Sequence, residues 1–317
     1  MPASKKPQTT FKELEIALLW GAWVELGVSG WEKTHRDWAV DPEPLILRTA
    51  ELADSEPRLR DEALDWSIHF WRYVSKVRLR NLLKERSGRA LDDWGRFAAT
   101  VNEHSGAHWP RAGEPFAYQI TGRSTLASMK QPSRAWLRLR AAFGVGARAE
   151  ILRFFLSGTS RASTALITAE LGYAKSNVMA ECESLEKAGV LRRGRIGNRY
   201  FYSLMHPDAL AEFVGEIAPV RPSWTALLEV TSSLVQLETR AAESPQRVLS
   251  VEAHRTYRRL DGLLDRLDIE ARPALARPDG YWTDLHSFAE PYLSAWASGR
   301  WDPKRPPTTI ARRTHER

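Results

Sequence analysis

Apolar residues recur at helical spacing over most of the chain, and this pattern predicts a mainly α-helical protein. Near the N-terminus, Phe11, Leu14, Leu18 and Ala22 lie three or four residues apart, which predicts a helix that ends at Gly27. The same periodicity, with cap and turn signals between the segments, predicts further helices at 41–53, 57–73, 76–86, 89–104, 147–156, 163–171, 174–188, 207–217, 223–242, 246–267 and 281–298.

Breaks in this pattern predict several domains. Glycine, proline and serine are scattered through 105–134, where we expect a short strand within 113–122 and a linker at KQPSR, residues 130–134. The predicted order is a flexible N-terminus at 1–10, an N-terminal helical domain at 11–130, a second domain at 136–206, a C-terminal helical domain at 207–299 and a basic, disordered tail at 300–317.

The segment 147–204 predicts three helices followed by a β-hairpin. The first helix places Ile151 and Phe155 on one side, and Ser163 can cap the start of the second. Gly172 permits the sharp turn that a helix-turn-helix requires before the third helix. The order of these elements therefore favours a helix-turn-helix domain.

The third helix, 174–188, has two different sides. Val178, Cys182 and Leu185 share an apolar side that we expect to face inwards. The leading turn and the opposite side are small and polar, with Lys175, Ser176, Asn177 and Ala180 as candidate contacts to DNA bases. Glutamates make the rear of this helix acidic, which favours groove contact through its first two turns.

A basic hairpin is predicted at 190–204. Gly194 and the pair Gly197-Asn198 supply turn chemistry between two short strands. Its polar residues are candidate contacts to the DNA backbone or the minor groove: Arg192, Arg193, Arg195, Asn198 and Arg199.

The run LGYAKSNVMAECESLEKAGVL and the basic hairpin after it resemble the winged helix-turn-helix regulators of the ArsR and MarR types. This resemblance covers about 65 residues and implies that helix 174–188 reads DNA, that the hairpin is a wing on the backbone, and that the protein is a homodimer. Two features depart from it: Ala174 stands where serine is frequent, and the metal-sensing cysteines of some ArsR-type proteins are absent. We therefore expect no metal effector.

These observations predict a sequence-specific regulator of transcription that binds double-stranded DNA, acts as a repressor and is not an enzyme. One alternative is a protein-interaction or antitoxin-like subunit that uses the winged helix as a platform. A second alternative is a DNA-processing enzyme. Against catalysis, the sequence has no P-loop, GxGxxG or GxSxG motif, and Gly106 interrupts the spacing of His104 and His108 as a metal pair. No cofactor or metal is expected.

A second basic element lies at 72–89, where seven lysines and arginines stand against one acidic residue. Its outline, a helix followed by a Ser75 cap and another helix, is also typical of a helix-turn-helix. The candidate second DNA contacts are Lys76, Arg78, Arg80 and Lys84. The alternative is an amphipathic helix with a solvated basic face.

Composition agrees with an anionic partner without identifying it. The 317 residues carry a formal net charge of +7, with an isoelectric point of about 9.6, so nucleic acid and membrane surfaces both remain open. The N-terminus lacks a signal-peptide core, and no run approaches the roughly 20 apolar residues of a membrane span. With one cysteine, Cys182, the sequence predicts a cytoplasmic protein.

The sequence contains 13 tryptophans, which favour a large aromatic core, with an aromatic small-molecule pocket as the alternative.

Overall fold

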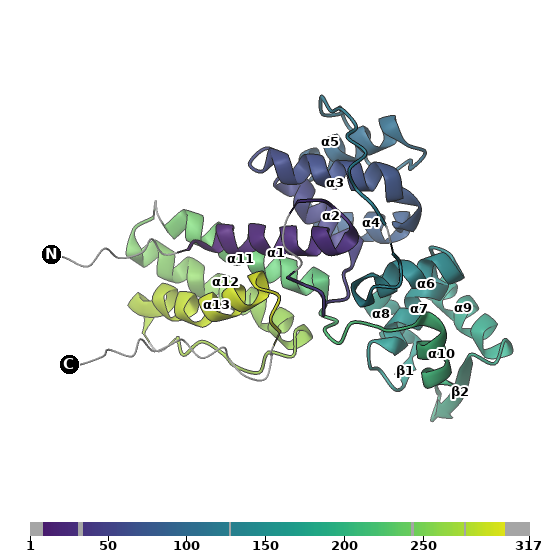
Figure 1. Ribbon diagram of the computed structural model, residues 1–317. Coiled ribbons are helices and arrows are strands. Elements are labelled where there is room, and N and C mark those ends of the chain that lie inside the picture. The colour runs from purple at the N-terminus through teal and green to yellow at the C-terminus, as the bar shows by residue number, and fades with distance from the viewer. Residues whose placement is uncertain (1–8, 31–33, 127, 242–243, 276, 302–317) are drawn as a thin grey trace, which may run out of the picture. The chain divides into compact units, whose positions relative to one another are not determined.

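A computed structural model describes residues 9–30, 34–126, 128–241, 244–275 and 277–301 (Figure 1). These residues form 13 α-helices and one three-stranded antiparallel sheet with the strand order β1-β3-β2, so the mainly helical prediction is confirmed. The chain divides into a central unit, residues 23–31 and 36–221, and a terminal unit, residues 1–22, 32–35 and 222–317. The predicted flexible N-terminus and basic tail lie largely outside the described residues.

Three helices of the central unit begin where proline or a serine cap favours a first turn. Pro42 and Pro57 start α2 (Pro42–Glu51) and α3 (Pro57–Phe70), and the Ser75 hydroxyl accepts a hydrogen bond from the Arg78 amide at the start of α4. The remaining elements of this half are the end of α1 (Phe11–Leu26), η1 (Trp71–Tyr73), α4 (Lys76–Leu82), η2 (Leu83–Glu85) and α5 (Arg89–His104).

Tryptophans form much of the core between these helices. Trp23, Trp66 and Trp94 are fully buried, and each indole N–H donates a hydrogen bond: to the Thr49 hydroxyl, to the Leu26 carbonyl and to the Pro110 carbonyl, respectively. Burial of these three side chains removes large apolar surfaces from water while each of their indole N–H groups keeps a partner. For these three residues the aromatic-core interpretation is confirmed.

The strand expected within 113–122 does not form. A buried carboxylate fixes this segment as a loop instead: Asp65 accepts hydrogen bonds from the amides of Thr121, Gly122 and Ser124, at 3.1, 2.7 and 2.8 Å. These amides are therefore not available for strand pairing.

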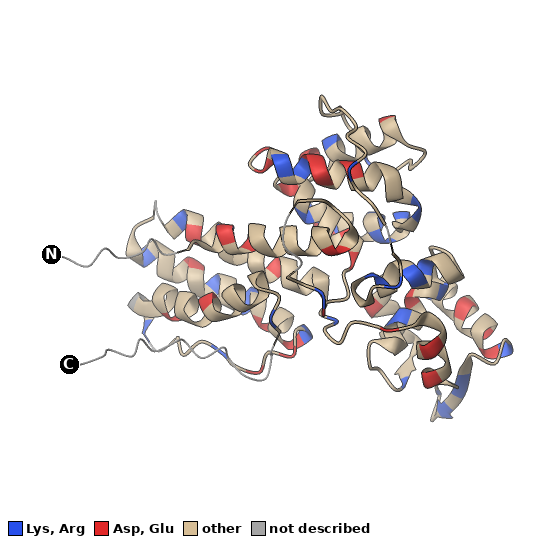
Figure 2. Ribbon diagram, in the orientation of Figure 1, with Lys and Arg blue, Asp and Glu red and all other residues tan. Residues whose placement is uncertain are grey.

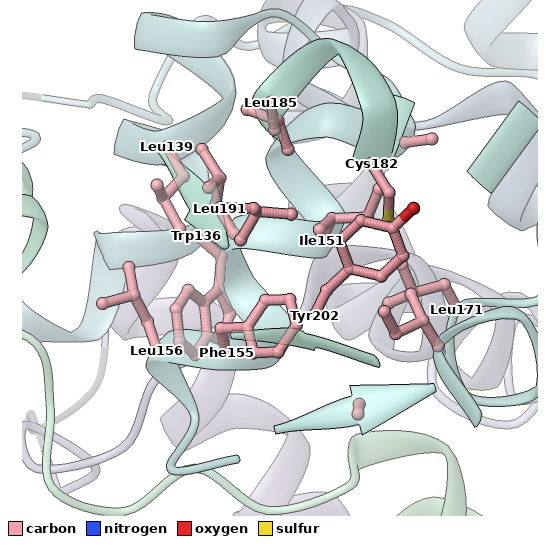
Figure 3. Close-up of a cluster of buried hydrophobic side chains, with 14 of the residues drawn as sticks. Trp136, Leu139, Ile151, Phe155, Leu156, Leu171, Cys182, Leu185, Leu191 and Tyr202 are labelled. Atoms are coloured by element: carbon pink, nitrogen blue, oxygen red, sulfur yellow. The ribbon is translucent and has the colours of Figure 1, made fainter. Parts of the chain in front are cut away.

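The other half of the central unit has its own apolar core. Its elements are η3 (Pro132–Arg134), α6 (Ala135–Phe143), α7 (Ala147–Leu156), β1 (Ala162–Ser163), α8 (Thr164–Leu171), α9 (Lys175–Lys187), β2 (Leu191–Ile196), β3 (Arg199–Leu204) and α10 (Pro207–Val214). Figure 3 shows the core, in which Ile151, Cys182 and Tyr202 bring α7, α9 and β3 together. At the predicted linker, residues 130–134, the Arg134 side chain is buried and donates a hydrogen bond to the Glu25 carbonyl.

The terminal unit is helical. It contains the start of α1, α11 (Trp224–Ala241), α12 (Gln246–Arg266), η4 (Pro278–Gly280) and α13 (Tyr281–Ala297). The ends of α11, α12 and α13 lie within one residue of those predicted. Leu227, Leu234 and Leu260 are buried inside this unit, so much of the apolar surface of α11 and α12 is already covered within one chain.

The predicted domain boundaries change in two places. Most of α1, up to Ala22, belongs to the terminal unit instead of an N-terminal domain at 11–130, and α10 packs on α6 instead of joining a domain at 207–299. Val214 of α10 lies in the same buried cluster as α7 and α9. In the part of the chain that the structure describes, none of the helices is both long enough and apolar enough to cross a membrane.

Candidate nucleic-acid interface

Local sequence explains how α8 leads into α9. The Ser163 hydroxyl accepts a hydrogen bond from the Leu166 amide, so the predicted cap of α8 is confirmed. Gly172 ends α8 in the left-handed region at φ 67°, which glycine adopts at little steric cost. Ala174 then precedes α9 without a side-chain cap. The chain therefore turns sharply between two short helices.

The two sides of α9 are arranged as the sequence predicts. Val178, Cys182 and Leu185 are buried in the core. The four residues predicted to approach DNA bases are all exposed: Lys175, Ser176, Asn177 and Ala180. Their exposure leaves the first two turns of α9 accessible, and their contact with DNA stays a prediction.

The hairpin β2–β3 begins directly after α9. Its strands pair from Leu191 with Leu204 to Ile196 with Arg199, with Gly197-Asn198 between them and φ 56° at Gly197. Leu191 is buried at its base, whereas residues 192–200 are exposed. The base is thus held by the core, while the outer part of the hairpin projects into solvent.

Four arginines of this hairpin differ in their partners. Arg193 lies 3.2 Å from the Glu186 carboxylate and sits over the Tyr200 ring, while Arg195 donates to the Gly197 carbonyl at 2.8 Å. Within the described residues, Arg192 and Arg199 have no ion-pair partner. Figure 2 shows this concentration of basic residues along the hairpin. Arg192 and Arg199 are therefore the two cations most available to an anionic ligand.

The acidic rear of α9 is partly neutralised. Glu181 pairs with Arg148 of α7 at 3.0 Å, and Glu186 pairs with Arg193 of the hairpin. Glu183 is exposed. Two of the three glutamates that limit groove contact thus have arginine partners, although both pairs are partly exposed and their electrostatic contribution is modest.

A buried ion-pair network lies behind the turn between α8 and α9. It consists of Asp41, Glu43, Arg78, Arg140, Glu150 and Arg153, which come from the start of α2 and from α4, α6 and α7. Glu43 is fully buried, lying 2.5 Å from Arg78 and 2.7 Å from Arg140. Three carboxylates face three guanidiniums, so the network balances its charge. No local pattern in the sequence indicates this network.

The network corrects one predicted DNA contact. Arg78 is buried and makes a bidentate pair with Asp41, with both N–O distances 2.6 Å. Its charge is therefore used inside the protein and is not available to phosphate. The other candidates of this element, Lys76, Arg80 and Lys84, are exposed.

Acid should weaken the ion pairs of Glu150 within this network. Burial acts to raise its pKa, but Arg140 and Arg153 outweigh burial and lower the pKa from 4.5 to about 2. The pKa of Glu150 is lower in the folded protein than in the unfolded chain. Ionised Glu150 therefore contributes its full stabilisation at pH values above 4.5, and this contribution is lost as the pH falls towards 2. We expect the stability difference between wild type and Glu150→Gln to shrink over this range in urea unfolding. A difference that grows on acidification would contradict this assignment.

No protein-family model, no curated protein and no solved structure matches this chain. Among the described residues, no group of three or more histidine, cysteine, aspartate or glutamate side chains has an arrangement that could hold a metal ion. The interpretation of the site therefore depends on the geometry of α9 and the hairpin.

Proposed function

We propose that the protein is a sequence-specific, double-stranded DNA-binding regulator of transcription that acts as a repressor through a winged helix-turn-helix. The observation that carries this proposal is the accessible, small and polar first half of α9 beside a projecting hairpin. Two arginines of this hairpin, Arg192 and Arg199, make no ion pair with any part of the chain that the structure describes. In this proposal α8 and α9 are the helix-turn-helix, and β2–β3 is the wing.

The physical roles of the two elements differ. A helix fits the roughly 12 Å wide major groove, where amide and hydroxyl groups distinguish base edges. Asn177 and Ser176 have that chemistry, and Lys175 lies at the end of α9 that would enter the groove first. The wing supplies guanidiniums for phosphates or for a narrow minor groove, which position the protein on DNA. A homodimer would place two such helices in successive major grooves.

One observation favours a protein-interaction platform as the second candidate. Phe213 of α10 is 69% exposed and packs on Phe143 at a ring distance of 5.8 Å, which leaves an aromatic patch on the same half of the central unit. Such a patch is typical of protein contacts. If DNA does not bind, this surface becomes the favoured site.

Fluorescence anisotropy with tiled DNA from upstream of the protein's own gene tests the proposal. Titrations at two salt concentrations, with excess nonspecific competitor, separate sequence-specific binding from general charge attraction. Tight binding to one fragment that survives the competitor supports a specific regulator. Equal, salt-sensitive binding to all fragments contradicts sequence specificity, and no binding at low salt contradicts DNA binding altogether.

The double variant Arg192→Gln/Arg199→Gln should weaken binding to every DNA sequence by a similar factor. Two lost phosphate contacts lower the slope of log affinity against log salt by about 2, while the preference among sequences stays the same. Anisotropy titrations over a salt series measure both quantities. Unchanged affinity and slope would show that the hairpin is not a DNA contact.

A further inference from the structure

Helix α4 lies against the turn that leads into α9. The Asn81 side-chain amide donates a hydrogen bond to the Gly172 carbonyl, and a Cβ placed on Gly172 would lie 3.8 Å from that of Asn81. At the other end of α4, the Ser75 and Tyr173 hydroxyls are 2.9 Å apart. Two contacts thus join α4 to two consecutive residues of the turn, only a few positions before Lys175.

The outer side of α4 and η2 carries basic residues that have no acidic partner within the described residues. Lys76 and Arg80 lie one helical turn apart, and Lys84 follows in η2, so the three form one exposed row that we call the α4 stripe. Within the described residues, none of the three has an ion-pair partner. Glu85, the acidic residue of this segment, is exposed beside them.

Burial of Arg78 separates this stripe from the charges that stabilise the fold. Arg78 lies on the inner side of α4 and connects it to α2 and α7 through Asp41, Glu43 and Glu150. Because the buried ion-pair network also includes Glu150 of α7, it holds α4 against a helix that packs on α9. The α4 stripe therefore has a fixed position relative to the first turn of α9.

The stripe and the wing adjoin opposite ends of α9. The stripe lies near the turn before Lys175, whereas β2 begins four residues after Lys187. Figure 1 shows α4 and β2 at opposite ends of the group of helices α6–α9. A duplex that receives the first turns of α9 in its major groove presents phosphates on both sides of that groove.

We infer that the α4 stripe is a second contact to the DNA backbone, which binds phosphates on the side of the major groove away from the wing. This inference rests on the proposed function and extends it, because one protein chain then contacts DNA through three elements. The ligand is the phosphodiester backbone of duplex DNA, so the stripe adds affinity and footprint length without adding base preference.

The double variant Arg80→Gln/Lys84→Gln tests the inference. We expect affinity for specific and nonspecific DNA to fall by the same factor, the salt slope to fall by about 2, and the ratio of the two affinities to stay unchanged. The matched control is Arg255→Gln/Arg258→Gln, which removes two exposed charges from α12. An unchanged salt slope in the α4 variant, or an equal fall in the control, would overturn the inference.

Crosslinking locates the contact independently of affinity. The native Cys182 does not interfere, because burial raises its pKa to about 12. A thiol-linked photoreactive group on Lys84→Cys should crosslink to the DNA backbone beyond the end of the region that the same group on Asn198→Cys labels. Labelling by the wing position alone would reject the α4 contact and leave the proposed function intact. If wild-type protein binds no DNA, the proposed function fails first.

Discussion

Replacing Glu43 by glutamine should lower the free energy of unfolding of the central unit by about 3–5 kcal/mol. Glu43 is fully buried and pairs with Arg78 and Arg140, and one of its oxygens also accepts a hydrogen bond from the Ser75 amide at 2.6 Å. Glutamine preserves the size of the side chain but removes its negative charge. Two guanidiniums then remain buried with less compensation, which is costly in a medium of low polarity.

Hydrogen exchange followed by mass spectrometry measures this loss for peptides of α2, α4, α6 and α7 separately from those of the terminal unit. The matched control is Asp54→Asn, which removes a carboxylate that pairs with Arg89 and Arg96 on the surface. Exposed pairs contribute about 0–1 kcal/mol, so the control should behave almost as wild type. Similar, small effects of both substitutions would contradict the structural role of the network.

The elements around α9 could be predicted because their signals are local. Ser163 caps α8, Gly172 adopts a positive φ, and the periodicity of Val178, Cys182 and Leu185 gives the buried side of α9. Each signal lies within a few residues of the feature that it determines, so no knowledge of distant parts of the chain is needed.

The buried ion-pair network could not be predicted because its partners are far apart in sequence. Arg78 and Glu43 are 35 residues apart, and Arg140 and Glu43 are 97 apart. In sequence, Arg78 looks like its neighbours Lys76 and Arg80, since all three are basic residues of one amphipathic segment. Only tertiary packing distinguishes the buried cation from the solvated ones.

Contacts between residues far apart in sequence also determine the loop at 113–122 and the division of α1 between two units. The sequence favours a strand within 113–122, but the distant carboxylate of Asp65 accepts hydrogen bonds from amides at the end of this segment. Phe11 at the start of α1 donates its amide hydrogen to Glu238 of α11, a contact across 227 residues. Periodicity identifies such a helix but not its partners.

A carboxylate on the outer side of α9 should abolish DNA binding, and Ala180→Glu is the sharpest test of that surface. Ala180 is exposed, and glutamate is a good helix former, so the fold should not change. In the proposed complex the new charge would lie in the strongly negative field of the major groove. Like-charge contacts of this kind cost several kcal/mol, which corresponds to a loss of affinity of about 100-fold or more.

Ala209→Glu is the matched control, because it makes the same substitution at an exposed position of α10 in the same half of the central unit. Its affinity should stay within about 3-fold of wild type, since one added surface charge acts on distant phosphates only through screened attraction or repulsion. Anisotropy measures both variants on specific and nonspecific DNA, with thermal unfolding as the check on folding. If DNA binds but both variants lose affinity equally, the effect comes from net charge. If DNA binds as tightly to Ala180→Glu as to wild type, α9 is not the element that enters the groove.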